Sequence, residues 1–180
     1  MKTARLSWHR LVGLRFPLLL ALLATVGCVT DVASRQSVDY DRGGIKRLVA
    51  AEAQRMRVPV PLALAVAHAE SNFDARALSA KGARGVMQIM PATARDEYAI
   101  QPSLLWDPKV NIRLGLHFLS RLLRRYGGRV DLALSYYNGG SAVGDLPRAR
   151  IIPATFRYVR KVQRFRLDYR RRIWRGAMDD

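Results

Sequence analysis

The sequence predicts a mostly α-helical fold, arranged as a single compact domain with little or no sheet. Apolar residues recur at helical spacing through most of the chain after residue 44, and no alternating apolar and polar run lasts beyond a few positions. The chain has 180 residues, 49% of them hydrophobic, so it can bury a core and is short enough for one domain. These observations argue against a disordered chain and against a sheet-based fold.

Residues 1–27 are expected to be a secretory signal peptide. They hold four basic residues and no acid, and residues 16–30 carry no charge. A helix that spans a bilayer needs roughly 20 apolar residues, whereas a basic start and a shorter apolar run are typical of a cleaved export signal. A buried N-terminal helix is the less favoured alternative, because Pro17 and Gly27 interrupt the run.

Cys28 is the single cysteine of the chain, and it lies near the end of this apolar run. A lone cysteine excludes an internal disulfide framework. The residues just before Cys28 are mostly small and resemble a bacterial lipobox, although Thr25 stands where leucine is usual. We therefore expect an exported lipoprotein, anchored through Cys28 to the outer membrane on its periplasmic side, with signal cleavage without lipidation as the alternative. Residues 28–43 are polar and are expected to form a tether.

Two helices are expected at the start of the folded part. Apolar residues at helical spacing begin at Ile45, and this first helix ends before Pro59. Pro61 suits the first position of the next helix. Residues 62–69 are apolar on every side, which predicts a fully buried helix that ends near residue 71.

Further helices are expected along the rest of the chain. Asp107 can cap a long helix whose first residue is Pro108, and Asp131 can cap a short apolar one. In chain order we expect a looser stretch at 72–90, helices at 91–98, 108–126 and 132–137, a loop at 141–153, and a last helix from about residue 155.

Glu70 is the most informative single residue, because a run of apolar residues leads directly into it. Carboxylates are almost never fully buried unless they are paired. Burial and the negative end of a helix would both raise the pKa of Glu70, and a carboxylic acid that stays protonated near neutral pH suits general-acid cleavage of a glycosidic bond. Taken without its neighbours, however, Glu70 is better explained as a structural carboxylate paired with an arginine such as Arg84.

The residues around and beyond Glu70 form four segments in a characteristic order. These segments are Glu70-Ser71, the block GARGVMQIMPAT from Gly82 to Thr93, the run LSYYNGG from Leu134 to Gly140, and Thr155 with Tyr158 and Val159. Over roughly residues 45–165 the chain thereby resembles the soluble lytic transglycosylase family, the goose-type-lysozyme-like enzymes that cleave bacterial peptidoglycan. Departures are Val86 in place of leucine, and Tyr136 and Gly139 in place of two alanines. The resemblance implies a lysozyme-like α+β fold that is mostly helical.

The resemblance also implies roles for individual residues. Glu70 would be the catalytic acid and base. Tyr137 would hydrogen-bond to Glu70 and orient it, although a core tyrosine is the simpler reading of the residue alone. The remaining implied site residues are Met87 and Gln88 as lining of the glycan groove, Asn138 as a substrate contact, and Ser71 and Tyr158 as residues that shape the site. Plain core packing is the alternative for Met87.

The implied reaction uses a single carboxylate, where ordinary glycosidases use two. Glu70 would protonate the oxygen between N-acetylmuramic acid (MurNAc) and N-acetylglucosamine (GlcNAc), and would then accept the proton of the C6 hydroxyl as a 1,6-anhydro ring closes. A hydrolytic lysozyme-like muramidase and a non-catalytic peptidoglycan-binding module are the alternatives. No cofactor and no metal are expected, because His9, His68 and His117 lack metal-ligand spacing.

The chain is strongly basic, with a formal net charge of +17 and a pI near 11.2, which indicates an anionic partner. Residues 157–180 hold nine basic and three acidic residues, including a helical stripe of Arg157, Arg160, Lys161 and Arg164. This stripe predicts docking onto the anionic envelope, onto peptidoglycan carboxylates or onto an acidic partner, with a solvated helix face as the alternative. A nucleic-acid binder would explain the charge but neither the export signal nor the four segments.

The expected organisation is therefore a signal peptide at 1–27, a tether at 28–43, a lytic transglycosylase catalytic domain at 44–165 and a basic tail at 166–180. The expected partners are peptidoglycan glycan strands, a membrane through the lipid anchor, and an envelope or secretion-machine protein. No nucleic acid is expected.

Overall fold

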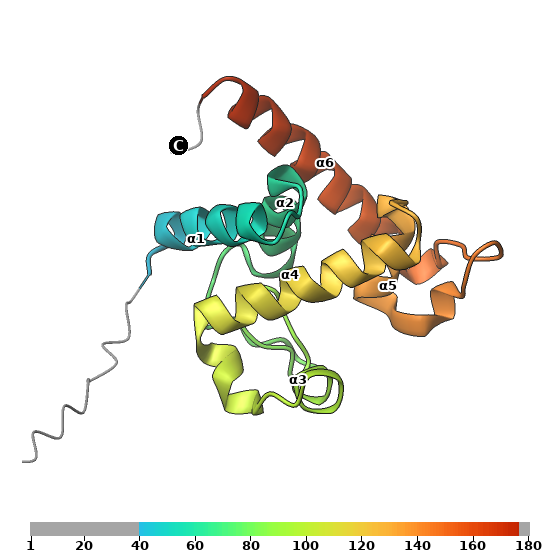
Figure 1. The fold of residues 1–180 in the computed structure, drawn as a ribbon, viewed down its shortest axis with the longest axis horizontal. Helices are drawn as coiled ribbons and strands as arrows, with labels where there is room; N and C mark the ends of the chain where they lie inside the picture. The colour runs from blue at the N-terminus through green and yellow to red at the C-terminus, as the bar shows by residue number, and fades with distance from the viewer. Residues whose placement is uncertain (1–39, 177–180) are drawn as a thin grey trace, which may run out of the picture. The chain divides into compact units, whose positions relative to one another are not determined.

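A computed structural model describes residues 40–176 (Figure 1). The expected signal peptide, Cys28 and most of the expected tether lie outside these residues. The described part contains six α-helices: α1 Arg42–Arg55, α2 Val60–Ser71, α3 Pro91–Tyr98, α4 Pro108–Arg125, α5 Val130–Gly139 and α6 Phe156–Trp174. Three short 3-10 helices join them: η1 Pro102–Trp106, η2 Gly140–Val143 and η3 Pro153–Thr155.

The prediction of a mostly helical fold with little or no sheet is confirmed. Residues 40–176 contain no strand, and their only bridges of the β type are two isolated pairs, Leu78 with Arg84 and Arg84 with Ile89. These bridges lie in the stretch between α2 and α3, which the sequence predicts to be looser. In this part of the chain no helix is long and apolar enough to cross a membrane.

Helix α2 forms the centre of the fold because it is apolar on every side. All six residues from Leu62 to Ala67 are buried, and the helix packs against α1 and α6. Pro61 lies in its first turn, one position later than predicted because the helix begins at Val60, and Asn72 ends it in the left-handed conformation, with φ 52°. The burial of α2 therefore brings its last turn, which carries Glu70, between packed neighbours.

Helix α4 is the long amphipathic helix that the sequence predicts. The side chain of Asp107 caps it by accepting hydrogen bonds from the N–H groups of Lys109, at 2.8 Å, and Val110, at 3.1 Å. Its buried face contributes Ile112, Leu116 and other residues to the main core, and it packs against α1, α5 and η1 (Figure 1).

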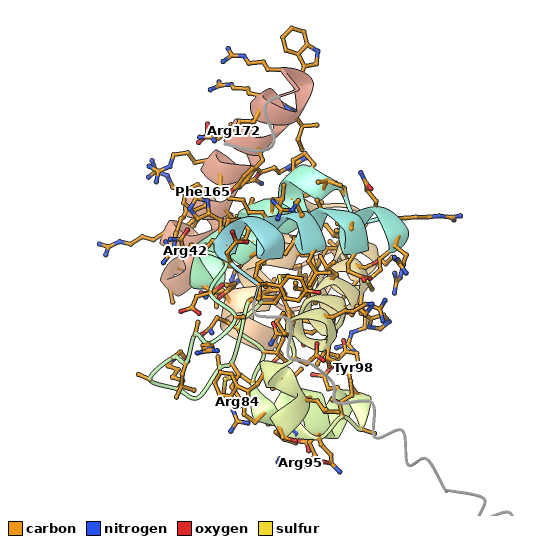
Figure 2. All side chains as sticks on the ribbon, turned by 90° about the vertical axis from the view of Figure 1, so that its left-hand side faces the viewer. Arg42, Arg84, Arg95, Tyr98, Phe165 and Arg172 are labelled. Atoms are coloured by element: carbon orange, nitrogen blue, oxygen red, sulfur yellow. The ribbon has the colours of Figure 1, made fainter. Side chains whose placement is uncertain are left out.

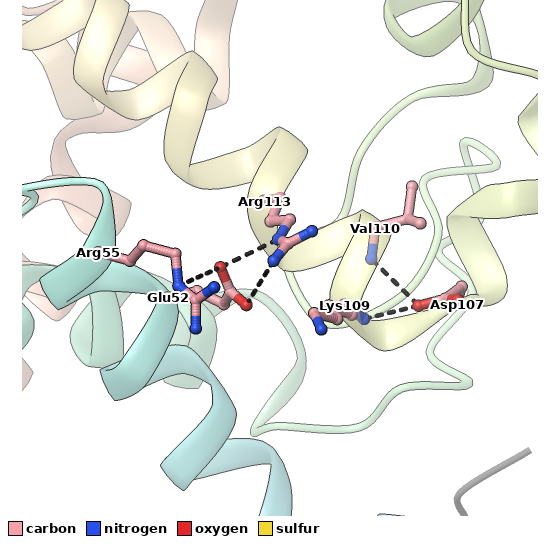
Figure 3. Close-up of polar contacts among 6 residues, drawn as sticks. All are labelled: Glu52, Arg55, Asp107, Lys109, Val110 and Arg113. Carbon is pink, nitrogen blue, oxygen red and sulfur yellow. Dashed lines mark hydrogen bonds and ion pairs between the residues drawn. The ribbon is translucent and has the colours of Figure 1, made fainter.

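An ion pair between Glu52 of α1 and Arg113 of α4 joins these two helices (Figure 3). The Glu52 side chain is only 2% exposed, and its two oxygens accept from Arg113 Nε at 3.0 Å and from Arg113 Nη2 at 3.1 Å. Arg55 lies farther off, with its Nε 3.8 Å from Glu52. The hydrogen bonds from Arg113 lower the pKa of Glu52 although burial alone would raise it.

Several boundaries differ from the sequence prediction. The residue that caps α5 is Arg129, without a side-chain hydrogen bond, and Asp131 lies inside the first turn, so the prediction that Asp131 is the cap is wrong. Asp131 instead lies near the positive end of the helix dipole, where a carboxylate is also favourable. Helix α6 runs without a break to Trp174, so the expected boundary at residues 165–166 falls inside a helix.

Candidate active site

Glu70 lies in the last turn of α2, one residue before the helix ends. Its side chain is partly buried, and burial raises its pKa from the usual value of 4.5 to about 7. A hydrogen bond from Tyr158 and the positive charge of Lys161 act in the opposite direction but do not cancel the effect of burial. Glu70 is therefore about half protonated at neutral pH, as a general acid requires.

Tyr158 is the residue that holds the carboxyl group of Glu70. It comes from the first turn of α6, and its hydroxyl donates to Glu70 Oε1 at 2.5 Å. Burial and the negative charge of Glu70 raise the pKa of Tyr158 well above its usual range, so the tyrosine remains a donor. Lys161, one turn later on α6, donates from Nζ to the carbonyl of Ala69 at 2.8 Å. Helix α6 thus holds the end of α2 through the side chain of Glu70 and through the backbone carbonyl of Ala69.

Tyr137 of α5 does not make the expected hydrogen bond to Glu70. Its hydroxyl donates to the carbonyl of Met87 at 2.9 Å, so the prediction that Tyr137 hydrogen-bonds directly to Glu70 is wrong and that bond belongs to Tyr158. Burial raises the pKa of Tyr137 well above its usual range, and the charge of Glu70 adds to this effect. Tyr137 therefore lies close enough to interact with Glu70, but it connects α5 to the loop that carries Met87.

The loop that contains Met87 is held by the fully buried Asn111 of α4. The Asn111 side chain accepts from the N–H of Met87 at 2.8 Å and donates to the carbonyl groups of Arg84, at 2.8 Å, and Leu105, at 3.0 Å. A Cβ on Gly85 would lie 2.5 Å from Asn111 Nδ2, and Gly85 has φ 71°, so a glycine is needed there. A polar residue on the apolar face of α4 is the signal in the sequence for this role, which the sequence predictions above do not include.

Met87 and Gln88 are both expected to line the glycan groove, but the Met87 side chain lies in the core. The Met87 side chain is fully buried and packs on Gly115 of α4, where a Cβ would lie 2.5 Å from Met87 Cβ, so the core alternative describes its side chain. The partly buried Gln88, at φ 48°, donates from Nε2 to the carbonyl groups of Ala77 and Gly85, at 3.1 and 3.0 Å. These bonds stabilise the loop.

Ser71 and Asn138 are the other expected site residues. Ser71 Oγ donates to the carbonyl of Val86 at 2.8 Å and so connects the end of α2 to the loop that contains Met87. Asn138 is exposed near the end of α5 and is open to solvent. Next to it, a Cβ on Gly139 would lie 2.5 Å from Ile152 Cδ1, so an alanine there would require the Ile152 side chain to move.

Arg84 is not the partner of Glu70, so the structural alternative for Glu70 is wrong. Its Nη1 donates to the carbonyl of Pro102 at 3.0 Å, and its guanidinium lies 5.4 Å from the centre of the Trp106 ring. Figure 2 shows Arg84 near α3, away from the labelled Arg172 of α6. No aspartate or glutamate of the described residues is among the groups that shift the pKa of Glu70. The site is thus a single partly buried acid held by one tyrosine, and such a group can donate and later accept a proton.

Comparison with known proteins defines the class to which this fold and site belong. Residues 47–145, more than half of the chain, match the model of the Transglycosylase SLT domain family. The chain therefore belongs to this family, which confirms the resemblance noted from its sequence segments.

Individual relatives and structures agree with this assignment. The chain is 42% identical over 72 residues to a transglycosylase of Enterobacteria phage PRD1, covering 40% of this chain and 26% of the relative. It is 32% identical over 78 residues to the soluble lytic murein transglycosylase of Escherichia coli K12, covering 39% and 12%. An inactive mutant of the lytic transglycosylase Slt of Pseudomonas aeruginosa superimposes with a TM-score of 0.62 at 26% identity, covering 75% of this chain and 25% of that one. The chain thus spans about a quarter of these proteins or less.

Proposed function

We propose that the chain is a peptidoglycan lytic transglycosylase that cleaves the β-1,4 bond between MurNAc and GlcNAc and leaves a 1,6-anhydro-MurNAc end. The observation that carries this proposal is the raised pKa of Glu70, about 7, in a site where Tyr158 holds one carboxyl oxygen. The names of several relatives, which are called lytic murein transglycosylases, support the same reaction class.

In the first step, protonated Glu70 donates its proton to the glycosidic oxygen, and the bond to the muramoyl C1 breaks. Oε1 is engaged by Tyr158, whereas Oε2 makes no hydrogen bond to any described residue, so Oε2 is the oxygen that can face the substrate. The positive charge that develops at C1 is stabilised by the N-acetyl group of the substrate itself. No enzyme nucleophile is then required, in agreement with the lack of a second carboxylate acting on Glu70 in residues 40–176.

In the second step, ionised Glu70 accepts the proton of the muramoyl C6 hydroxyl, whose oxygen attacks C1 and closes the anhydro ring. Because this hydroxyl belongs to the same sugar, the attack is intramolecular and gains from proximity. Glu70 returns to its protonated form, so one group serves as acid and then as base. A hydrolytic muramidase would instead transfer the sugar to water.

The products of digestion test this proposal. Purified peptidoglycan is incubated with the protein, and the released fragments are weighed by mass spectrometry. Anhydromuropeptides are expected, and Glu70→Gln should release none. Reducing-end muropeptides would instead indicate a hydrolytic muramidase. If the unaltered protein released no fragments, a non-catalytic peptidoglycan-binding module would be indicated.

We further propose that the chain is exported and acts in the periplasm, with residues 1–27 as the signal peptide, Cys28 as a lipidated first residue and 28–43 as a tether to the outer membrane. The catalytic domain is placed at 44–165, followed by the basic segment 166–180. Growth with labelled palmitate should label the protein, and Cys28→Ala should abolish the label. A mature N-terminus at another residue would contradict the lipoprotein proposal.

A further inference from the structure

Helix α6 carries a row of basic side chains that the proposed reaction does not use. Four basic residues of α6 lie on one side of the helix, because Arg157 is three and four residues before Arg160 and Lys161, and Arg164 is four and three residues after them. Together they line one hollow of the surface. All four are exposed. We call these four residues the basic row. Figure 2 shows nitrogen-tipped side chains projecting along α6, on which Phe165 and Arg172 are labelled.

The basic row makes no ion pair in the described part of the chain, although the charge of Lys161 acts on Glu70. No aspartate or glutamate of residues 40–176 forms an ion pair with any of its members, whereas Asp168 on the same helix lies 3.8 Å from Arg171. Uncompensated charges of one sign in a shared hollow repel one another and raise the local concentration of anions. The hollow therefore suits a ligand with several negative charges.

The basic row lies directly beside Glu70. Its Lys161 donates to the carbonyl of Ala69, the residue before Glu70, and Tyr158, which follows Arg157 in the chain, donates to Glu70 itself. The positive charge of Lys161 also acts on Glu70. A polymer whose bond is cleaved at Glu70 therefore comes close to Lys161, and the three arginines line the same hollow as Lys161. The row lies outside residues 47–145, so it is not part of the segment that defines the family.

We propose that the basic row binds the free carboxylates of the peptide stems that the MurNAc residues carry, and so favours strands with charged stems over strands without them. This proposal rests on the proposed function of Glu70. Arginine suits such ligands because its guanidinium can hold a carboxylate through two parallel hydrogen bonds. An anionic membrane is the competing ligand, since α6 also exposes Phe156, Leu167 and Trp174. The stem carboxylates are favoured because Lys161 of the row donates to the carbonyl of the residue just before Glu70, where the strand would bind.

The test compares two substrates that differ only in charge. Soluble uncross-linked glycan strands are used with native stems, and the same strands are used after their stem carboxylates have been converted to amides with a carbodiimide and ammonia. The test variant is Arg157→Gln/Arg160→Gln/Arg164→Gln, which spares Lys161 and its bond to α2. The matched control is Arg170→Gln/Arg171→Gln/Arg175→Gln, which removes the same charge from exposed positions at or just beyond the far end of α6.

The unaltered protein is expected to cleave native strands with a kcat/KM about tenfold above that for amidated strands, since three exposed charge contacts are each worth a fraction of a tenfold factor. The test variant should show the same low value on both, while the control keeps the preference. Equal cleavage of both strands by the unaltered protein, or a test variant that keeps the preference, would overturn the proposal. So would a test variant that loses only its binding to vesicles of anionic phospholipid.

Binding separates this proposal from the proposed function. The Glu70→Gln variant is mixed with labelled strands of both kinds, and their affinities are measured by fluorescence anisotropy. Tighter binding of native strands, lost on adding the three arginine substitutions, supports the basic row even if no lytic product is ever found. Equal binding of native and amidated strands refutes it even if Glu70 proves catalytic.

Discussion

Glu52 on α1 and Glu70 on α2 are both withdrawn from water, yet their surroundings shift their pKa values in opposite directions. Glu52 receives two hydrogen bonds from the Arg113 guanidinium, which lower its pKa. Glu70 receives one hydrogen bond from a neutral tyrosine hydroxyl, and burial raises its pKa to about 7. Both carboxylates extend from helices of the same core.

The difference shows that burial alone does not make a catalytic acid. A guanidinium placed against a carboxylate favours the charged form, whereas a tyrosine hydroxyl steadies the group without supplying a full charge. The region between α1 and α4 therefore holds an ion pair that joins two helices, and the region between α2 and α6 holds an acid that can exchange its proton.

Replacing each glutamate by glutamine is the strongest test of the difference between Glu70 and Glu52. Glu70→Gln keeps the size of the side chain and its contact with Tyr158 but removes the transferable proton, so kcat should fall at least about 1,000-fold. Glu52→Gln should leave kcat within about twofold at temperatures where the fold is intact. Release of soluble muropeptides from peptidoglycan measures both, and comparable losses in the two variants would contradict the distinction.

The next largest effect is expected on stability. Arg113→Met leaves Glu52 buried without its main partner, and a buried charge that loses its partner is strongly destabilising, so Tm should fall by about 8 °C at pH 7. Its folded-state pKa would then rise, and the loss should shrink as the pH falls towards 4, because Glu52 becomes neutral in both states. Calorimetry over this pH range measures the effect, and a loss that grows towards low pH would contradict it.

Glu70 should also destabilise the fold, but only when it is ionised. Its pKa is higher in the folded state than the usual 4.5, so the stability that protonated Glu70 supplies is full below about pH 4.5 and is lost as the pH rises through about 7. Glu70→Gln removes this loss and should be more stable than the unaltered protein by about 3 kcal/mol at pH 8, with no difference at pH 4. Urea unfolding at the two pH values measures this, and equal stability at pH 8 would show that Glu70 is not desolvated.

The smallest effect separates the two tyrosines near Glu70. Activity should fall as Glu70 loses its proton, near pH 7, and Tyr158→Phe should move this falling limb to higher pH by up to about one unit, because the lost hydrogen bond lowers the pKa. Tyr137→Phe should leave the midpoint in place, since its hydroxyl donates to the Met87 carbonyl. A pH profile of kcat/KM decides between them. A shift of the midpoint caused by Tyr137→Phe alone would instead support the sequence expectation that Tyr137 hydrogen-bonds to Glu70.

Much of the fold could be predicted because its signals are local. The apolar run before Glu70 marks α2, and Asp107 with Pro108 marks the start of α4, and both lie where the sequence places them. The cap of α5 could not be predicted in this way, because Asp131 suits a cap and a first-turn position equally well.

The partners within the site were harder to predict. Tyr137 and Tyr158 both stand in recognisable segments, and nothing in their neighbours says which hydroxyl reaches Glu70. That depends on how α5 and α6 pack against the end of α2, over separations of 67 and 88 residues along the chain. The same holds for Asn111, whose amide reaches back 24 residues to Met87.

The sequence by itself determined the family, the helical class and the candidate acid Glu70, because these follow from short-range spacing and from segments that can be read in order. Only the tertiary structure decided which groups surround that acid. It placed Tyr158 and Lys161 of α6 beside Glu70, directed Arg84 to Pro102, and gave Arg113 to Glu52. The pKa of a buried group depends on atoms within a few ångströms, and packing brings those atoms from distant parts of the chain.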